Sequence, residues 1–157
     1  MNSIQNQSNN LGGIAKIWLI PSRLIFSHLY DYPIGLLQLP VNWANDAWQI
    51  TPVFQSASYT QDMQQSPSGT WWENTVSFKI PRYTLDNKPF AGTLSRLLWA
   101  VLTLDQNGEF LLVGSKDYPM RLSVKMTSGA DLSELSHLAI SVTGKSPILP
   151  LNIAITH

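Results

Sequence analysis

The chain has 157 residues and no cysteine, and its ten basic residues balance its ten acidic ones. Charged residues make up only 13% of the chain, about half the roughly 25% of an ordinary domain. Without cysteine there is neither a disulfide framework nor thiolate chemistry. A net charge of zero argues against specific binding of nucleic acid, which needs clustered lysine and arginine. No apolar run approaches the roughly 20 residues of a membrane span, and no secretory signal is visible.

Residues 1–13 are polar, rich in asparagine and glutamine, and end in two glycines. Such a segment buries too little apolar surface to offset its ordering entropy, so we expect a flexible N-terminal arm. The remainder, 14–157, is expected to be a single β domain. It opens with a β-rich run at 14–20 that stops at Pro21. Short helical turns are expected only at 22–28 and 90–96.

The stretch 53–80 is expected to form one long hairpin. Its arms are 53–65 and 69–80, and its tip is Ser66-Pro67-Ser68-Gly69, because proline presets φ and glycine permits a positive φ. Arms of this length would reach about 40 Å, longer than a small domain requires. The end near the tip is polar, so it cannot fill a core and needs a partner.

The second half of the chain carries the clearest strand signals. Residues 97–104 are almost wholly apolar, as in a central strand covered on both faces, and the turn 105–108 leads into a returning strand at 109–114. Apolar residues alternate with polar ones at 120–126 and 138–142. Short strands separated by turns predict an all-β fold, an antiparallel β-sandwich or barrel.

The sequence offers no catalytic, metal-binding or cofactor-binding constellation. His28, His137 and His157 are dispersed, and no nucleophile elbow, phosphate loop or carboxylate pair appears. Asp105-Gln106-Asn107-Gly108 fits a hairpin turn better than a calcium loop, because the later ligands are missing. We therefore expect that the protein is not an enzyme and takes no small-molecule substrate.

Six tryptophans are the one aromatic excess. Adjacent residues of a strand point to opposite faces, so one of Trp71 and Trp72 must leave the core. Exposed aromatic residues mark subunit interfaces or sugar-stacking platforms. The candidate interface residues are therefore four tryptophans, Trp43, Trp48, Trp71 and Trp72, and three polar residues of the hairpin, Gln61, Asp62 and Gln64. The alternative is a carbohydrate-binding β-sandwich that uses exposed tryptophans.

Several strand–turn segments resemble small virion proteins of tailed phages that infect Bacteroidetes, including the crAss-like group. The first is the opening strand Gly13-Ile14-Ala15-Lys16-Ile17-Trp18-Leu19-Ile20-Pro21. The others are Asp105-Gln106-Asn107-Gly108, Leu112-Val113-Gly114, Tyr118-Pro119-Met120-Arg121 and Val142-Thr143-Gly144. The resemblance as a whole covers about 60 residues, and it carries no catalytic signature.

The resemblance implies a tail-tube-like β-barrel or sandwich that assembles into a ring or tube at the phage neck or tail. The implied partners are copies of the same chain and neighbouring virion proteins. The implied location is the virion, after synthesis in the host cytoplasm without secretion.

Overall fold

The computed structural model describes residues 12–25, 43–81, 92–127, 137–147 and 151–153. Their strands and short helices, in chain order, are β1 (Ile14–Pro21), the 3-10 turn η1 (Ser22–Leu24), α1 (Trp43–Asp46), β2 (Trp48–Ile50), β3 (Ser58–Ser66), β4 (Gly69–Pro81), β5 (Leu98–Asp105), β6 (Phe110–Val113), β7 (Met120–Thr127), β8 (His137–Ser146) and β9 (Leu151–Ile153). A further helical turn covers 92–94. The all-β fold expected from the sequence is confirmed. No helix in these ranges is long and apolar enough to cross a membrane.

The nine strands form one antiparallel sheet in the order β2-β1-β5-β7-β8-β4-β3. The sheet branches at β5, whose first two residues pair with β7 while 101–104 pair with β6. Beyond β6 the branch ends at β9, which among the described strands pairs with β6 alone and forms an edge of the sheet. Because all strands share one sheet, the barrel-like alternative describes the architecture better than two separate stacked sheets.

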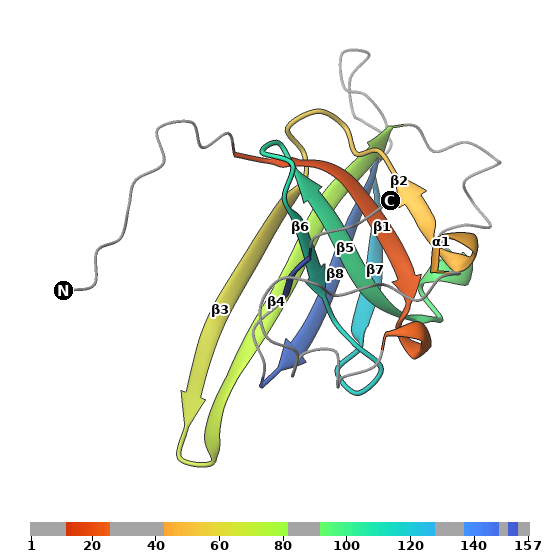
Figure 1. The fold of residues 1–157 in the computed structure, drawn as a ribbon. Coiled ribbons are helices and arrows are strands. Elements are labelled where there is room, and N and C mark those ends of the chain that lie inside the picture. The colour runs from red at the N-terminus through yellow and green to blue at the C-terminus, as the bar shows by residue number, and fades with distance from the viewer. Residues whose placement is uncertain (1–11, 26–42, 82–91, 128–136, 148–150, 154–157) are drawn as a thin grey trace.

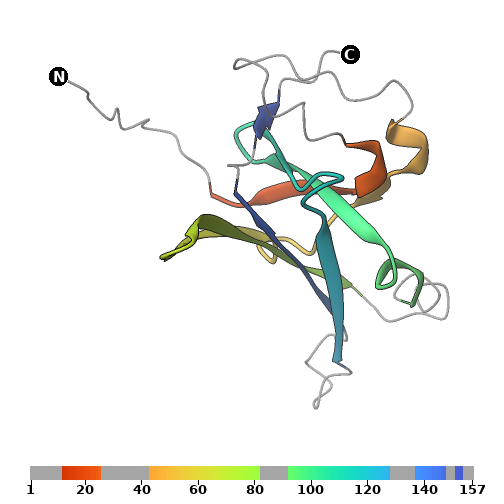
Figure 2. The same cartoon turned by 90° about the horizontal axis from the view of Figure 1, so that it is seen from below.

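The sheet curls so that its two ends face each other. In the view from below, β3 and β4 lie across from β1 (Figure 2). The segment between β2 and β3 bridges the two ends, because the backbone N–H of Val53 donates to the carbonyl of Lys79 on β4 (2.9 Å). The concave side holds the main core, which includes Ile17, Phe78 and Trp99. Curling lets one sheet bury its own apolar face, as in a barrel.

A second, smaller core lies on the opposite face of β1, β5 and β6. Ile20, Leu102 and Leu112 are fully buried there. Trp43 of α1 packs against Trp18 of β1 in an edge-on arrangement, with ring centroids 6.4 Å apart. Strand β5 is thus covered on both faces, as its apolar run predicts.

Met120 lies between Gly144 of β8 and Gly114, which directly follows β6. A Cβ at Gly144 on β8 would come 2.9 Å from Cγ of Met120, and a Cβ at Gly114 would come 3.1 Å from the same atom. The segments 112–114, 118–121 and 142–144 therefore meet around one buried side chain. Glycine is required at 144 by close packing, whereas Gly114 also has a positive φ of 92°.

Two details differ from the sequence-based expectation. Leu98 begins β5 but is 41% exposed, because it lies at the end of the strand where only β7 pairs with it. The first arm of the hairpin begins at Ser58 rather than at residue 53. Residues 53–57 instead form a turn, with Gln55 at a positive φ of 58° and the Ser56 hydroxyl donating to the Val53 carbonyl.

Candidate assembly interface

The hairpin of β3 and β4 reaches past the body of the sheet (Figure 1). Its strands pair from Ser58↔Ser77 to Ser66↔Gly69, whereas the pairing of β4 with β8 begins only at Trp72↔Ser146. Among the described residues β3 pairs with β4 alone. The predicted tip is confirmed: Pro67 and Ser68 form the turn, and Gly69 takes a φ of 138°. The Ser66 hydroxyl accepts the Ser68 backbone N–H and supports the turn.

The concave face of the hairpin continues the core toward the tip. Val76 is in the core, and alternation puts Asn74 and Trp72 on the same face, opposite Gln61 and Met63 of β3. Met63 is 51% exposed and lies directly across from the half-buried Trp72. The apolar side chains of this face therefore continue along the hairpin beyond the core, as far as Met63 and Trp72.

Polar side chains interrupt this apolar face between the core and the Met63–Trp72 pair. The Tyr59 hydroxyl donates to Oδ1 of the buried Asn74 (2.8 Å). Burial raises the pKa of Tyr59 to about 12, because it disfavours the charged phenolate. The neighbouring Gln61 Nε2 is buried and has no hydrogen-bond partner among the described residues. A buried amide donor without a partner costs free energy.

The convex face of the hairpin carries a compact charged and aromatic cluster. Lys145 of β8 forms an ion pair with Glu73 (2.9 Å) and lies 5.8 Å from the ring centre of Trp71. The Trp71 indole N–H also donates to Glu73 (3.4 Å). The hydrogen bonds from Lys145 and then from Trp71 hold the pKa of the Glu73 carboxyl below its usual value.

Five of the seven predicted interface residues lie on the β3–β4 hairpin. Gln61 and Trp72 share its concave face, and Asp62, Gln64 and Trp71 share its convex face. The two adjacent tryptophans therefore point to opposite faces, as the sequence predicts.

The other two candidates lie away from the hairpin. Trp43 is half-buried in α1 against Trp18, so it packs within the fold instead of standing out as a platform. Trp48 lies on the edge strand β2 and is 46% exposed.

Three residues that complete these surfaces were not identified from the sequence: Met63, Lys145 and Arg121. Met63 could have been found, because it continues the two-residue spacing of Tyr59 and Gln61. Lys145 and Arg121 could not, because their proximity to β4 depends on the pairing of β4 with β8, whose partners lie more than 50 residues apart in the sequence.

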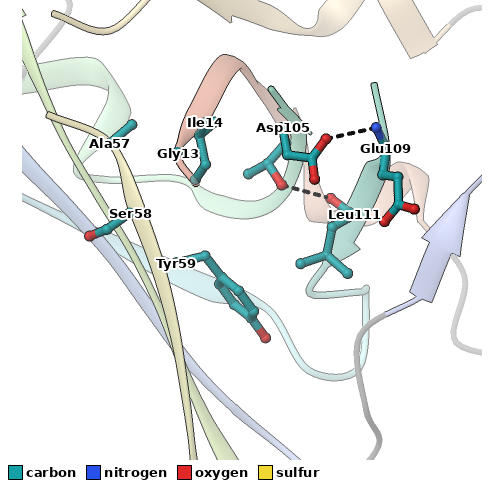
Figure 3. Close-up of a pocket in the computed structure, with 9 residues that line it drawn as sticks. Gly13, Ile14, Ala57, Ser58, Tyr59, Asp105, Glu109 and Leu111 are labelled. Atoms are coloured by element: carbon teal, nitrogen blue, oxygen red, sulfur yellow. Dashed lines mark hydrogen bonds between the residues drawn. The ribbon is translucent and has the colours of Figure 1, made fainter. Parts of the chain in front are cut away.

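A separate cavity of about 360 Å³ opens at the mouth of the curled sheet, between the starts of β1 and β3 and the β5–β6 turn (Figure 3). Its polar groups largely satisfy one another. The Asp105 carboxylate accepts the backbone N–H groups of Asn107 and Glu109, both at 2.8 Å, and so closes the turn predicted at 105–108. The Thr103 hydroxyl donates to the Leu111 carbonyl (3.4 Å).

In the described part of the chain, no three histidine, aspartate or glutamate side chains gather where they could hold a metal ion. His137 lies on β8, while His28 and His157 fall outside the described residues, as does the N-terminal arm up to residue 11. Comparison of the chain with protein-family models, with curated proteins and with solved structures gives no match.

Proposed function

We propose that the protein is a structural subunit that assembles with copies of itself, and that the β3–β4 hairpin is the joint. The observation that carries the proposal is the open edge of β3, nine residues long, on a hairpin that reaches beyond the body. The assembly is a ring or tube, and its place in the neck or tail of a phage virion rests on the resemblance of the strand–turn segments.

The free edge of β3 supports this joint. Edge strands expose backbone N–H and C=O groups that can pair with another chain, and proteins usually protect them with lysine, proline or a bulge. The sequence of β3, Ser58–Ser66, contains no lysine, arginine or proline, and its pairing with β4 runs without a register shift. Asp62 is its one charged residue. This edge is therefore suited to strand addition by a neighbouring molecule.

The concave face of the hairpin supports the same conclusion independently. Met63 and Trp72 present an apolar pair beyond the core, and aromatic residues and methionine are enriched at protein interfaces. A neighbouring copy that covers this face would bury the apolar pair.

The low charge content suits close packing of many copies. Burying a charged side chain at an interface costs desolvation energy, and only 13% of this chain is charged. A ring needs a head-to-tail contact, in which the hairpin of one copy meets a different surface of the next.

One pair of substitutions tests the joint. Met63→Lys puts a charge on the concave face of the edge strand, a natural means of blocking edge pairing. Ser123→Lys puts the same charge on an exposed residue of β7, outside the hairpin. In sedimentation velocity we expect oligomers for the unmodified chain and for Ser123→Lys, and monomers for Met63→Lys. Identical sedimentation of all three would overturn the proposed joint.

A further inference from the structure

A cleft of about 550 Å³ lies beside the Trp71–Glu73–Lys145 cluster, on the face of the sheet opposite to the Met63–Trp72 pair of the proposed joint. It is formed by a step in the sheet. Strand β7 begins at Met120 and pairs with β8 only up to Arg121↔Thr143, while β8 and β4 continue past it to Trp72↔Ser146. The lining residues come from three strands and the loop before β7: Glu73, Asn74, Thr75, Pro119, Arg121, Thr143, Gly144 and Lys145.

The two ends of this cleft differ in chemistry. At one end Arg121 is exposed and forms no ion pair with any described residue, and the hydroxyls of Thr143 and Thr75 follow it in the same cross-strand row. A guanidinium has a planar set of donors that matches a carboxylate. At the other end Lys145 and Glu73 lead to the indole of Trp71.

The separation of the two ends sets the size of a ligand that could use both. Arg121 and Trp71 are two strands apart and four residues apart along the strand direction. With strand spacings of about 4.8 Å and a rise of about 3.3 Å per residue, the distance is about 16 Å. That is the length of a short oligosaccharide and exceeds a single sugar.

We propose that this cleft binds an acidic saccharide, with a sugar carboxylate on Arg121 and a sugar ring against Trp71. Hydroxyls and a carboxylate between the two ends, from Thr75, Thr143 and Glu73, supply donors and acceptors for sugar hydroxyls. The lining holds two cations and one carboxylate, so its charge favours an acidic ligand over a neutral one.

The test uses the full-length protein and calorimetric titration with trigalacturonic acid and sialyllactose. The neutral comparison probes are the methyl ester of the first and lactose. We expect an acidic probe to bind more tightly than its neutral counterpart. Arg121→Gln should weaken acidic binding at least about tenfold, as loss of a charge-assisted hydrogen bond does. Trp71→Ala should weaken binding of the acidic and neutral probes alike.

The matched control is Lys125→Gln, which removes one exposed positive charge from the same strand, outside the cleft. It should leave the affinity unchanged, and circular dichroism should be the same for all variants. Absence of binding by both acidic probes at millimolar concentration would overturn the proposal, and so would equal affinity of Arg121→Gln and the unmodified chain. Sedimentation of Arg121→Gln should match that of the unmodified chain, so failure of this site and failure of the joint are distinguishable.

Discussion

The close contact of Gly144 with Met120 predicts that Gly144→Ala destabilises the fold. Gly144 lies within β8 and its φ is not in the left-handed region, so backbone conformation alone would permit alanine. The added Cβ, however, would lie 2.9 Å from Met120 Cγ and 3.2 Å from the Pro119 carbonyl oxygen. Met120 is only 1% exposed, and the backbone of Gly114 lies close to the same Cγ, which limits its retreat.

Two opposing effects set the magnitude. Forcing an extra carbon into a packed core costs about 1–3 kcal/mol. Replacing glycine by alanine in a permitted conformation restricts the unfolded chain and so raises the free energy of unfolding by about 0.4–1 kcal/mol. We therefore expect Gly144→Ala to lower the free energy of unfolding by about 1–2 kcal/mol. In a Met120→Ala background the clashing Cγ is gone while the contact with the Pro119 carbonyl remains, so the same substitution should cost less than in the unmodified chain.

Urea denaturation followed by tryptophan fluorescence measures these differences. The control is Gly92→Ala, because a Cβ at Gly92 meets no atom within 4 Å and its φ is not in the left-handed region. It should leave stability unchanged or raise it slightly. If Gly144→Ala were as stable as Gly92→Ala, or if its cost were undiminished in the Met120→Ala background, the packing argument would be wrong.

Three further predictions follow from buried and charged groups. Val101 is fully buried, so Val101→Ala should lower the free energy of unfolding by about 1–3 kcal/mol in urea melts. Leu98 is 41% exposed, so Leu98→Ala should lower it by less than about 1 kcal/mol. The reverse order would contradict the placement of β5. Since the pKa of Tyr59 is about 12 in the folded chain against an ordinary 10, its contribution to stability is complete below pH 10 and is lost as pH rises toward 12. Tyr59→Phe should reduce that alkaline loss in pH-dependent urea melts, and an unchanged alkaline profile would refute it. Lys145→Gln should raise the pKa of Glu73 toward its usual value in carboxyl-carbon NMR titration, and an unmoved pKa would show that the ion pair does not form in solution.

Local signals in the sequence predict the strands and turns well. Alternation at 120–126 and 138–142 corresponds to β7 and β8, and the Asp105 turn forms because its side chain and Gly108 at a φ of 85° close it together. The hairpin tip is found for the same reason, since proline and glycine act within a few residues. These features depend only on neighbours in sequence.

The arrangement of the strands depends on contacts that the sequence does not display. Strand β4 pairs with β8, more than 60 residues later, and this pairing brings Lys145 to Glu73. The curl of the sheet redirects 53–57 into a turn that bonds to β4, although its composition also suits a strand. A continuous apolar run likewise does not reveal which end is exposed, so the exposure of Leu98 appears only once β5 is placed in the sheet.

The most direct test of the proposed assembly is the mass in solution of a chain with a shortened hairpin. Replacing 63–72 with Asn-Gly preserves the pairing of Asp62 with Glu73 and removes the part of the hairpin that projects. Light scattering should give a multiple of the 17.5 kDa subunit mass for the full chain and a single subunit for the shortened one, with matching circular dichroism of the β body. A full chain that is monomeric at every concentration, or a shortened chain that still assembles, would contradict the account.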